Sequence, residues 1–176
     1  PGIHNVENAL AAFSMAYIKG LSVNSIVGSI ASFSGVKRRF EYHVKTEHQI
    51  YIDDYAHHPK EIEVAIRSVR DLFPNKELTV IFQPHLFSRT RDFMDDFARV
   101  LSFADHVMLL DIYPARELPI EGVTSQVLLN KITVKNKWLY DKSKFTEVVA
   151  ESSVLMTLGA GDIDELIQPI KAYLGS

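Results

Sequence analysis

From about residue 36 onward, short apolar runs alternate with segments of helical periodicity, and this alternation constrains the fold more than any other feature of the chain. Residues 77–82 are almost continuously apolar, as in strands buried within parallel sheets. Strands that alternate with helices in this way predict a mainly parallel sheet, with helices on both faces and right-handed crossovers. We therefore predict an α/β, Rossmann-like, doubly wound fold.

A β-hairpin is expected at the start of this sheet. Residues 38–45 and 49–54 have strand-like patterns and are separated by a short turn. From Pro59 to about Phe73, apolar residues recur at spacings of three and four, which indicates a helix. Pro59 suits the first helical position, where its missing N–H group costs nothing. The second strand of the hairpin therefore leads into a helix N-terminus.

The first 35 residues have a different pattern. Two helical segments are predicted, at about 4–18 and 22–33, with no strand between them. Two helices cannot enclose a core alone. We therefore assign residues 1–35 to the end of a preceding domain and residues 36–176 to the α/β domain. Because the chain begins with Pro1 inside a motif-like run, we interpret it as part of a longer protein.

Polar and charged residues gather where the predicted strands end. They are Asp53, Asp54, Tyr55, His57 and His58 after the second strand, His85, Ser88, Arg89 and Arg91 after the third, Asp111 and Arg116 after the fourth, and residues 159–162 after the last. The carboxyl ends of parallel strands meet at one edge of a sheet, where ligands bind in this architecture. Any one of these residues could simply belong to an exposed loop, but polar and charged residues at four strand ends together favour a binding site.

The residue types at this edge suggest three kinds of contact. The carboxylates at 53–54 could bind a cation or accept hydrogen bonds from ribose hydroxyls. Arg89 or Arg91 could bind a carboxylate or phosphate with its forked guanidinium. Because the two residues are two positions apart, their side chains would point to the same side only on extended backbone. Gly159 and Gly161 precede a helix whose free N–H groups could bind an anion, although glycine also simply permits a tight turn.

Other classes of site are disfavoured. His57 and His58 could be metal ligands, but consecutive side chains diverge in extended backbone and no third ligand stands at a suitable spacing. The chain has no cysteine, which excludes disulfides and thiolate metal sites and fits a cytoplasmic protein. A net charge of −3 without a basic run argues against nucleic acid or anionic membranes as partners. His4 and Asn8 could simply cap a helix.

Six stretches of the chain together resemble the Mur ligases. They are PGIHNVENALAA at 1–12, GVKRRFE at 35–41, DDYAHHP at 53–59, FQPHLFSRTR at 82–91, DIYPARE at 111–117 and GAGDI at 159–163. Members of this family have a UDP-binding domain, a central ATPase domain with a phosphate loop, and a Rossmann-like C-terminal domain. The resemblance implies that this chain is the end of the central domain followed by the whole C-terminal domain.

Within the family, the resemblance is strongest to enzymes that add L-alanine to UDP-N-acetylmuramate in peptidoglycan synthesis. It implies an ATP-dependent ligase that forms an acyl phosphate, with Mg²⁺ ligands and the phosphate loop upstream of residue 1. The isolated chain is therefore expected to be inactive. Carried over by motif, the residues expected to contact ATP are His4, Asn8, Arg39 and Asp54. Those expected to bind L-alanine are Tyr55, His57, His85, Arg89 and Ala160.

One departure and two alternatives accompany this hypothesis. Many relatives have arginine where this chain has Leu86, so Arg89 is expected to bind the carboxylate of L-alanine alone.

The sister ligase that attaches a recycled murein tripeptide shares much of the histidine motif. The run 111–117, with residues 119–125 after it, favours the alanine enzyme. A non-enzymatic α/β module that binds nucleotides or anions is the alternative from another class.

Overall fold

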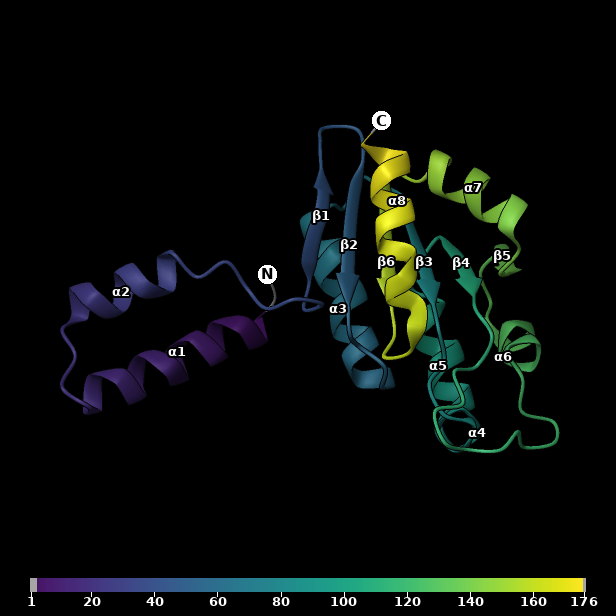
Figure 1. Ribbon diagram of the computed structural model, residues 1–176, viewed down its shortest axis with the longest axis horizontal. Helices are drawn as coiled ribbons and strands as arrows, with labels where there is room; N and C mark the ends of the chain where they lie inside the picture. Colours follow the sequence, from purple (N-terminus) through teal and green to yellow (C-terminus); the bar gives the residue numbers. More distant parts are fainter. Residues whose placement is uncertain (1–2, 176) are drawn as a thin grey trace. The chain divides into compact units, whose positions relative to one another are not determined.

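A computed structural model describes residues 3–175 of the chain, except the side chains of Ile3, His4 and Ser143. The chain divides into two compact units, Pro1–Lys37 and Arg38–Ser176. The first contains α1 (Ile3–Ile18) and α2 (Val23–Ala31) (Figure 1). Ser22 caps α2 by accepting a hydrogen bond from the N–H of Ser25. Both predicted helices are present, and the second ends two residues earlier than expected.

The helices of the first unit expose many apolar side chains. Leu10, Ile18 and Phe33 are 64%, 81% and 67% exposed, whereas Ile26 is buried. As the sequence pattern indicates, these two helices have no core of their own.

The second unit is built on a six-stranded sheet with the order β1-β2-β6-β3-β4-β5. The strands are β1 (Glu41–Lys45), β2 (Ile50–Asp54), β3 (Leu78–Phe82), β4 (His106–Leu109), β5 (Asn136–Leu139) and β6 (Val154–Leu158). β1 pairs with β2 antiparallel, and every other pair is parallel. The predicted α/β sheet with an N-terminal hairpin is therefore confirmed.

Helices cover both faces of this sheet (Figure 1). The helices packed on one face are α3 (Pro59–Leu72), α5 (Met94–Leu101) and α6 (Ser125–Lys131); those on the other are α7 (Lys142–Glu151) and α8 (Ile167–Leu174), the latter preceded by the 3₁₀ helix η1 (Asp162–Leu166). The central strands β3 and β6 are buried along their whole length, as their apolar sequences predict.

The sheet has a topological switch at β6, which lies between β2 and β3. The chain leaves β2 and β3 toward helices on one face, but it leaves β6 toward η1 and α8 on the other. Connections that diverge from neighbouring strands open a crevice at their carboxyl ends, where ligands bind in open α/β sheets. The carboxyl edge of the sheet on either side of β6 is therefore where a ligand is expected in this architecture.

Three local features differ from the sequence prediction. The sequence analysis names no helix directly after the third strand, but α4 (Phe87–Asp92) begins there and α5 follows after a break at Phe93. The first strand begins at Glu41 because Arg38 and Phe40 have positive φ angles of 57° and 47°. The last helix opens with a 3₁₀ turn rather than an α-helical one.

A buried ion pair fixes the start of the second unit to the sheet. Arg38 Nε donates to Asp53 Oδ2 over 3.0 Å, and Arg38 Nη2 donates to the carbonyl oxygen of Gly159 over 2.7 Å. Asp53 is fully buried, and its Oδ1 accepts a hydrogen bond of 2.6 Å from Thr157 Oγ1. Because both oxygens of Asp53 are hydrogen-bonded inside the protein, this carboxylate is part of the framework.

Removing the guanidinium would leave Asp53 buried without its countercharge. We expect Arg38→Ala to lower the free energy of unfolding by about 3 kcal/mol, the typical cost of breaking a buried ion pair on one side. Chemical denaturation of the chain measures this. Arg67→Ala, which removes an exposed pair with Glu63, is the matched control and should change little. Equal effects from the two substitutions would contradict the framework role of Arg38.

Candidate functional site

The carboxyl ends of β2, β6 and β3 lie level with one another. In the sheet register Asp54 pairs with Leu158, and Leu158 pairs with Phe82. The chain therefore leaves all three strands at the same height. The residues that follow them form one rim, at the carboxyl ends of the strands on either side of the topological switch.

Four aromatic side chains from three segments lie in a row along this rim. The ring of His57 lies 5.3 Å from that of Tyr55 and 6.1 Å from that of His85. His85 in turn stacks on Tyr113, with 5.6 Å between ring centroids and 16° between planes. Tyr55 and His57 follow β2, whereas His85 follows β3. The structure thus brings together three residues that the sequence analysis assigned to one pocket.

Arg89 lies on α4, the helix that follows His85, and each of these two side chains has a polar atom whose hydrogen bonding is incomplete. Arg89 Nη1 and His85 Nδ1 are buried and have no hydrogen-bond partner among the residues that the structure describes. A buried polar atom without a partner is costly, so these two atoms are open to a hydrogen bond from a ligand or from water. A guanidinium in this state suits a carboxylate or a phosphate group.

Burial and neighbouring charge favour the neutral form of His85. Its pKa is lowered from the usual 6.5, first by desolvation, then by the positive charge of Arg89 and by His57. Because the pKa of His85 is lower in the native state, the unfolded chain binds more protons than the native chain as the pH falls through 6.5. Protonation of His85 therefore lowers the free energy of unfolding as the pH falls from about 6.5 to the native pKa.

The long loop after β4 is attached to the segment that carries His85. Tyr113 N–H donates to the carbonyl oxygen of Pro84 over 2.9 Å, and Leu86 N–H donates to that of Tyr113 over 2.9 Å. Farther along the loop, Glu117 accepts hydrogen bonds from the N–H and the hydroxyl of Ser88, over 2.9 Å and 2.5 Å. These contacts hold loop 110–124 against the start of α4.

Asp54 is held by the backbone but keeps some capacity to accept hydrogen bonds. Its two oxygens accept the N–H groups of Phe40 and Ala56, each over 2.7 Å. Burial raises the pKa of Asp54. A carboxylate has about four lone-pair sites, so hydroxyl groups can still bind beside these two donors. Arg39 is exposed, with no hydrogen bond or ion pair recorded for its guanidinium in the described part of the chain, and it acts on Asp54 electrostatically.

The turn after β6 packs closely against β3 and the loop after β4. A Cβ atom at Gly159 would lie 2.9 Å from the carbonyl oxygen of Gln83, and one at Gly161 would lie 2.7 Å from Cβ of Tyr113. Only glycine permits so close an approach at either position. Between them, Ala160 is partly exposed on the rim.

Gln83 is a rim residue whose role the sequence analysis missed. It is buried, its Oε1 accepts the N–H of Ile163 over 3.0 Å, and its Nε2 donates to Asp162 Oδ1 over 2.5 Å. One N–H group at the start of η1 is therefore taken by Gln83 and is not available to an anion. A neutral amide at the end of an apolar strand gives little signal in sequence.

Several other candidates lie apart from this cluster or have structural roles. His58 accepts a hydrogen bond from Lys60 N–H at the start of α3 and packs on Phe93. Arg91 is exposed and pairs with Asp92. Because α4 is helical, the side chains of Arg91 and Arg89 point in different directions. Asn8 is an exposed residue of α1 in the first unit, and the side chain of His4 lies outside the described residues.

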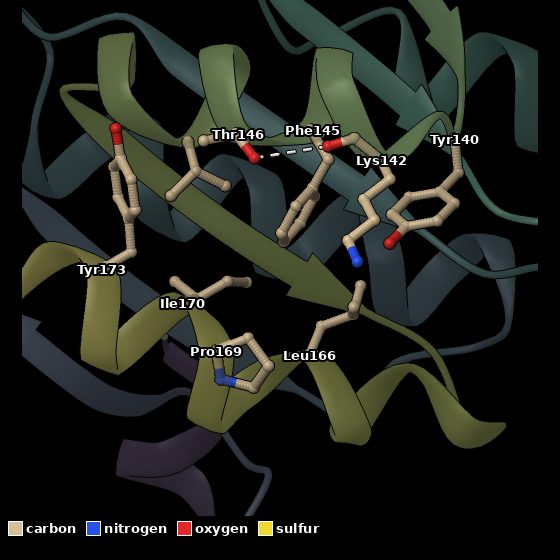
Figure 2. Close-up of a pocket in the computed structure, with 9 residues that line it drawn as sticks. Tyr140, Lys142, Phe145, Thr146, Leu166, Pro169, Ile170 and Tyr173 are labelled. Atoms are coloured by element: carbon tan, nitrogen blue, oxygen red, sulfur yellow. Dashed lines mark hydrogen bonds between the residues drawn. The ribbon is translucent and has the colours of Figure 1, made fainter.

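A separate groove of about 290 Å³ lies between α7 and α8 (Figure 2). Its lining is mostly apolar and includes two phenol groups and one amine. The lining residues are Tyr140, Lys142, Phe145, Thr146, Val149, Leu166, Pro169, Ile170 and Tyr173. None of the predicted site residues lines this groove, and it has no acid. The groups suited to a nucleotide or an amino acid lie on the rim instead.

Among the residues that the structure describes, no group of three or more histidine, aspartate or glutamate side chains is arranged to hold a metal ion. No helix among them is long and apolar enough to cross a membrane.

Residues 38–163 match the family model for the Mur ligase, glutamate ligase domain. Two curated relatives are named UDP-N-acetylmuramate–L-alanine ligase. That of Cytophaga hutchinsonii is 56% identical over 97% of this chain, and that of Christiangramia forsetii is 51% identical over 99%. The chain spans only 37% and 39% of their lengths.

Solved structures give a consistent picture. The crystal structure of UDP-N-acetylmuramate–alanine ligase from Thermotoga maritima is similar to this chain, with a TM-score of 0.81 and 27% identity. The similarity covers 99% of this chain and 38% of the Thermotoga chain. A murein peptide ligase from Psychrobacter arcticus matches with a TM-score of 0.66 and 22% identity, which shows a shared fold.

The charge of Arg89 should be measurable through its effect on His85. We expect Arg89→Met to raise the pKa of His85 toward 6.5, because the substitution removes a neighbouring positive charge and keeps an apolar stem. NMR titration of the histidine ring protons measures this pKa. Arg91→Met removes an exposed charge and is the control. An unchanged His85 pKa in the Arg89 variant would mean that the two groups do not interact.

Proposed function

Because the chain belongs to the Mur ligase family, we propose that it is the C-terminal part of an ATP-dependent ligase that joins L-alanine to UDP-N-acetylmuramate in peptidoglycan synthesis. The single observation that carries the proposal is the 56% identity, over nearly the whole chain, to a ligase of that name. In this proposal residues 1–35 are the last helices of the central ATPase domain, and residues 36–176 are the C-terminal domain. ATP and a nucleotide sugar as substrates fit a cytoplasmic enzyme.

L-Alanine is assigned to the rim cluster. Its carboxylate would bind the Arg89 guanidinium, whose Nη1 lacks a partner within the described chain. His57 and His85 would flank the amino acid, with Tyr55 and Ala160 lining the pocket. A neutral His85 supports this assignment, because it adds no repulsion toward the ammonium group of the incoming substrate.

ATP is assigned to a second group of residues. Asp54 has acceptor sites left for ribose hydroxyls, and Arg39 is exposed and available to ribose or phosphate. His4 and Asn8 of the first unit are proposed to contact the adenine. Mg²⁺ would be held by residues upstream of this chain.

The proposed reaction has two steps. The carboxylate of UDP-N-acetylmuramate attacks the γ-phosphorus of ATP, which forms an acyl phosphate and releases ADP. The amine of L-alanine then attacks the acyl carbon, an amide bond forms as the nitrogen releases a proton to solvent, and inorganic phosphate leaves with the C–O electron pair. The residues of this chain would act by holding the amine close to the acyl carbon, so that the second step becomes effectively intramolecular.

Two other functions give different results in simple experiments. The sister ligase would prefer a murein tripeptide as the amine, so turnover of the full-length protein with L-alanine against tripeptide separates the two. The 0.81 TM-score to the alanine enzyme, against 0.66 to the murein peptide ligase, supports the former. A non-enzymatic binding module would bind ATP at micromolar affinity with this chain alone, whereas a ligase part should bind it weakly.

Loss of the Arg89 charge should affect L-alanine far more than ATP. In the full-length enzyme we expect Arg89→Met to raise the KM for L-alanine about a hundredfold, as for the loss of a charged hydrogen bond. The KM for ATP should stay within about twofold, because ATP does not contact this residue in the proposal. Steady-state kinetics with each substrate varied in turn gives both values. An unchanged KM for L-alanine would exclude Arg89 as its anchor.

A second expectation concerns the chain by itself. Because the phosphate loop and Mg²⁺ ligands are proposed to lie upstream, residues 1–176 should form no amide bond from L-alanine, ATP and UDP-N-acetylmuramate. Isothermal titration calorimetry with ATP should detect no micromolar binding. Micromolar ATP affinity of the isolated chain would favour the binding module.

A further inference from the structure

The helix that carries Arg89 lacks a cap from its own sequence. α4 has only six residues, and Leu86, which precedes it, provides no side-chain hydrogen bond to its first N–H groups. Leu86 also has a φ of 72°, an unfavourable conformation for a residue with a side chain. A helix that starts in this way needs acceptors from elsewhere in the chain.

Glu117 supplies these acceptors from a distant loop. Its Oε2 accepts the Ser88 N–H over 2.9 Å, and its Oε1 accepts the Ser88 hydroxyl over 2.5 Å. The hydrogen bonds from Ser88 lower the pKa of Glu117, so the carboxylate is charged near neutral pH. A negative charge at a helix N-terminus is also favoured by the helix dipole.

The loop that carries Glu117 also contacts the second residue of the cluster. Tyr113 stacks on the ring of His85 and exchanges backbone hydrogen bonds with the segment around it. One loop therefore fixes His85 through Tyr113 and the start of α4 through Glu117. The guanidinium of Arg89 has no hydrogen-bond partner at Nη1 among the described residues, although Glu117 acts on it electrostatically.

We propose that Glu117 is a positioning residue for L-alanine: by capping α4 it holds the Arg89 guanidinium where the amino acid's carboxylate binds. This inference rests on the proposed function and assigns to Glu117 a role in binding one substrate. Glu117 does not touch L-alanine itself. Its contribution reaches the substrate through the backbone of Ser88 and Arg89.

Kinetics of the full-length enzyme test the proposal. Glu117→Ala removes the cap and should raise the KM for L-alanine about tenfold, as for the loss of one helix cap. The kcat at saturating L-alanine and the KM for ATP should stay within about twofold. Glu117→Gln keeps one acceptor oxygen and should restore most of the L-alanine affinity. Glu121→Ala, an exposed acid in the same loop, is the matched control and should behave as wild type.

A second measurement tests the capping of α4 by Glu117 in the absence of substrate. Hydrogen–deuterium exchange of residues 84–92 should be faster in Glu117→Ala than in wild type, with no change in β3. Ser88→Ala removes the hydroxyl bond to Glu117 but keeps the backbone N–H that Glu117 caps, so it should raise the KM for L-alanine less than Glu117→Ala does, and the double variant should be no worse than Glu117→Ala alone.

The outcomes separate this inference from the proposed function. An unchanged KM for L-alanine in Glu117→Ala, or an equal rise in the KM for ATP, overturns the positioning role. Unchanged exchange of residues 84–92 overturns the cap. If the wild-type enzyme does not use L-alanine although exchange rises as expected, the proposed substrate is wrong and the cap alone stands.

Discussion

The parallel pairing of β2, β6 and β3 is the constraint on which the rest of the structure depends. Their register places Asp54, Leu158 and Phe82 side by side, so three segments far apart in sequence leave the sheet at one height. Backbone hydrogen bonds continue the register past the strand ends, from Gly159 to Asp54 and from Gln83 to Leu158. Apolar side chains buried on both faces hold the strands in place. Slippage of a single strand would separate the candidate ligand-binding groups.

Two kinds of polar residue occupy this rim, and hydrogen bonding distinguishes them. Asp53 is fully buried, with both oxygens bonded inside the chain, and it connects Arg38 to the sheet. By contrast, Arg89 and His85 are buried at atoms that have no partner in the described part of the protein. The first arrangement is complete and stabilises the fold. The second leaves polar atoms open to a ligand or to water, and we propose L-alanine as that ligand.

Much of this could be predicted from sequence, and the failures have physical causes. The convergence of His57 with His85 follows from strand–helix alternation, because parallel strands place their carboxyl ends together. The helix α4 was missed because its first residue has no capping side chain before it and its cap comes from Glu117, 29 residues away from Ser88. Gln83 was missed because a neutral amide resembles any strand end. Such long-range partners leave no local pattern.

We propose that the rim cluster of His57, His85 and Arg89 binds L-alanine, and a crystal structure of the full-length enzyme with L-alanine tests this. The amino acid's carboxylate should lie within hydrogen-bond distance of the Arg89 guanidinium, and its carbon atoms should lie beside the rings of His57 and His85. L-Alanine bound away from this rim, with Arg89 turned to a protein acceptor, would contradict it.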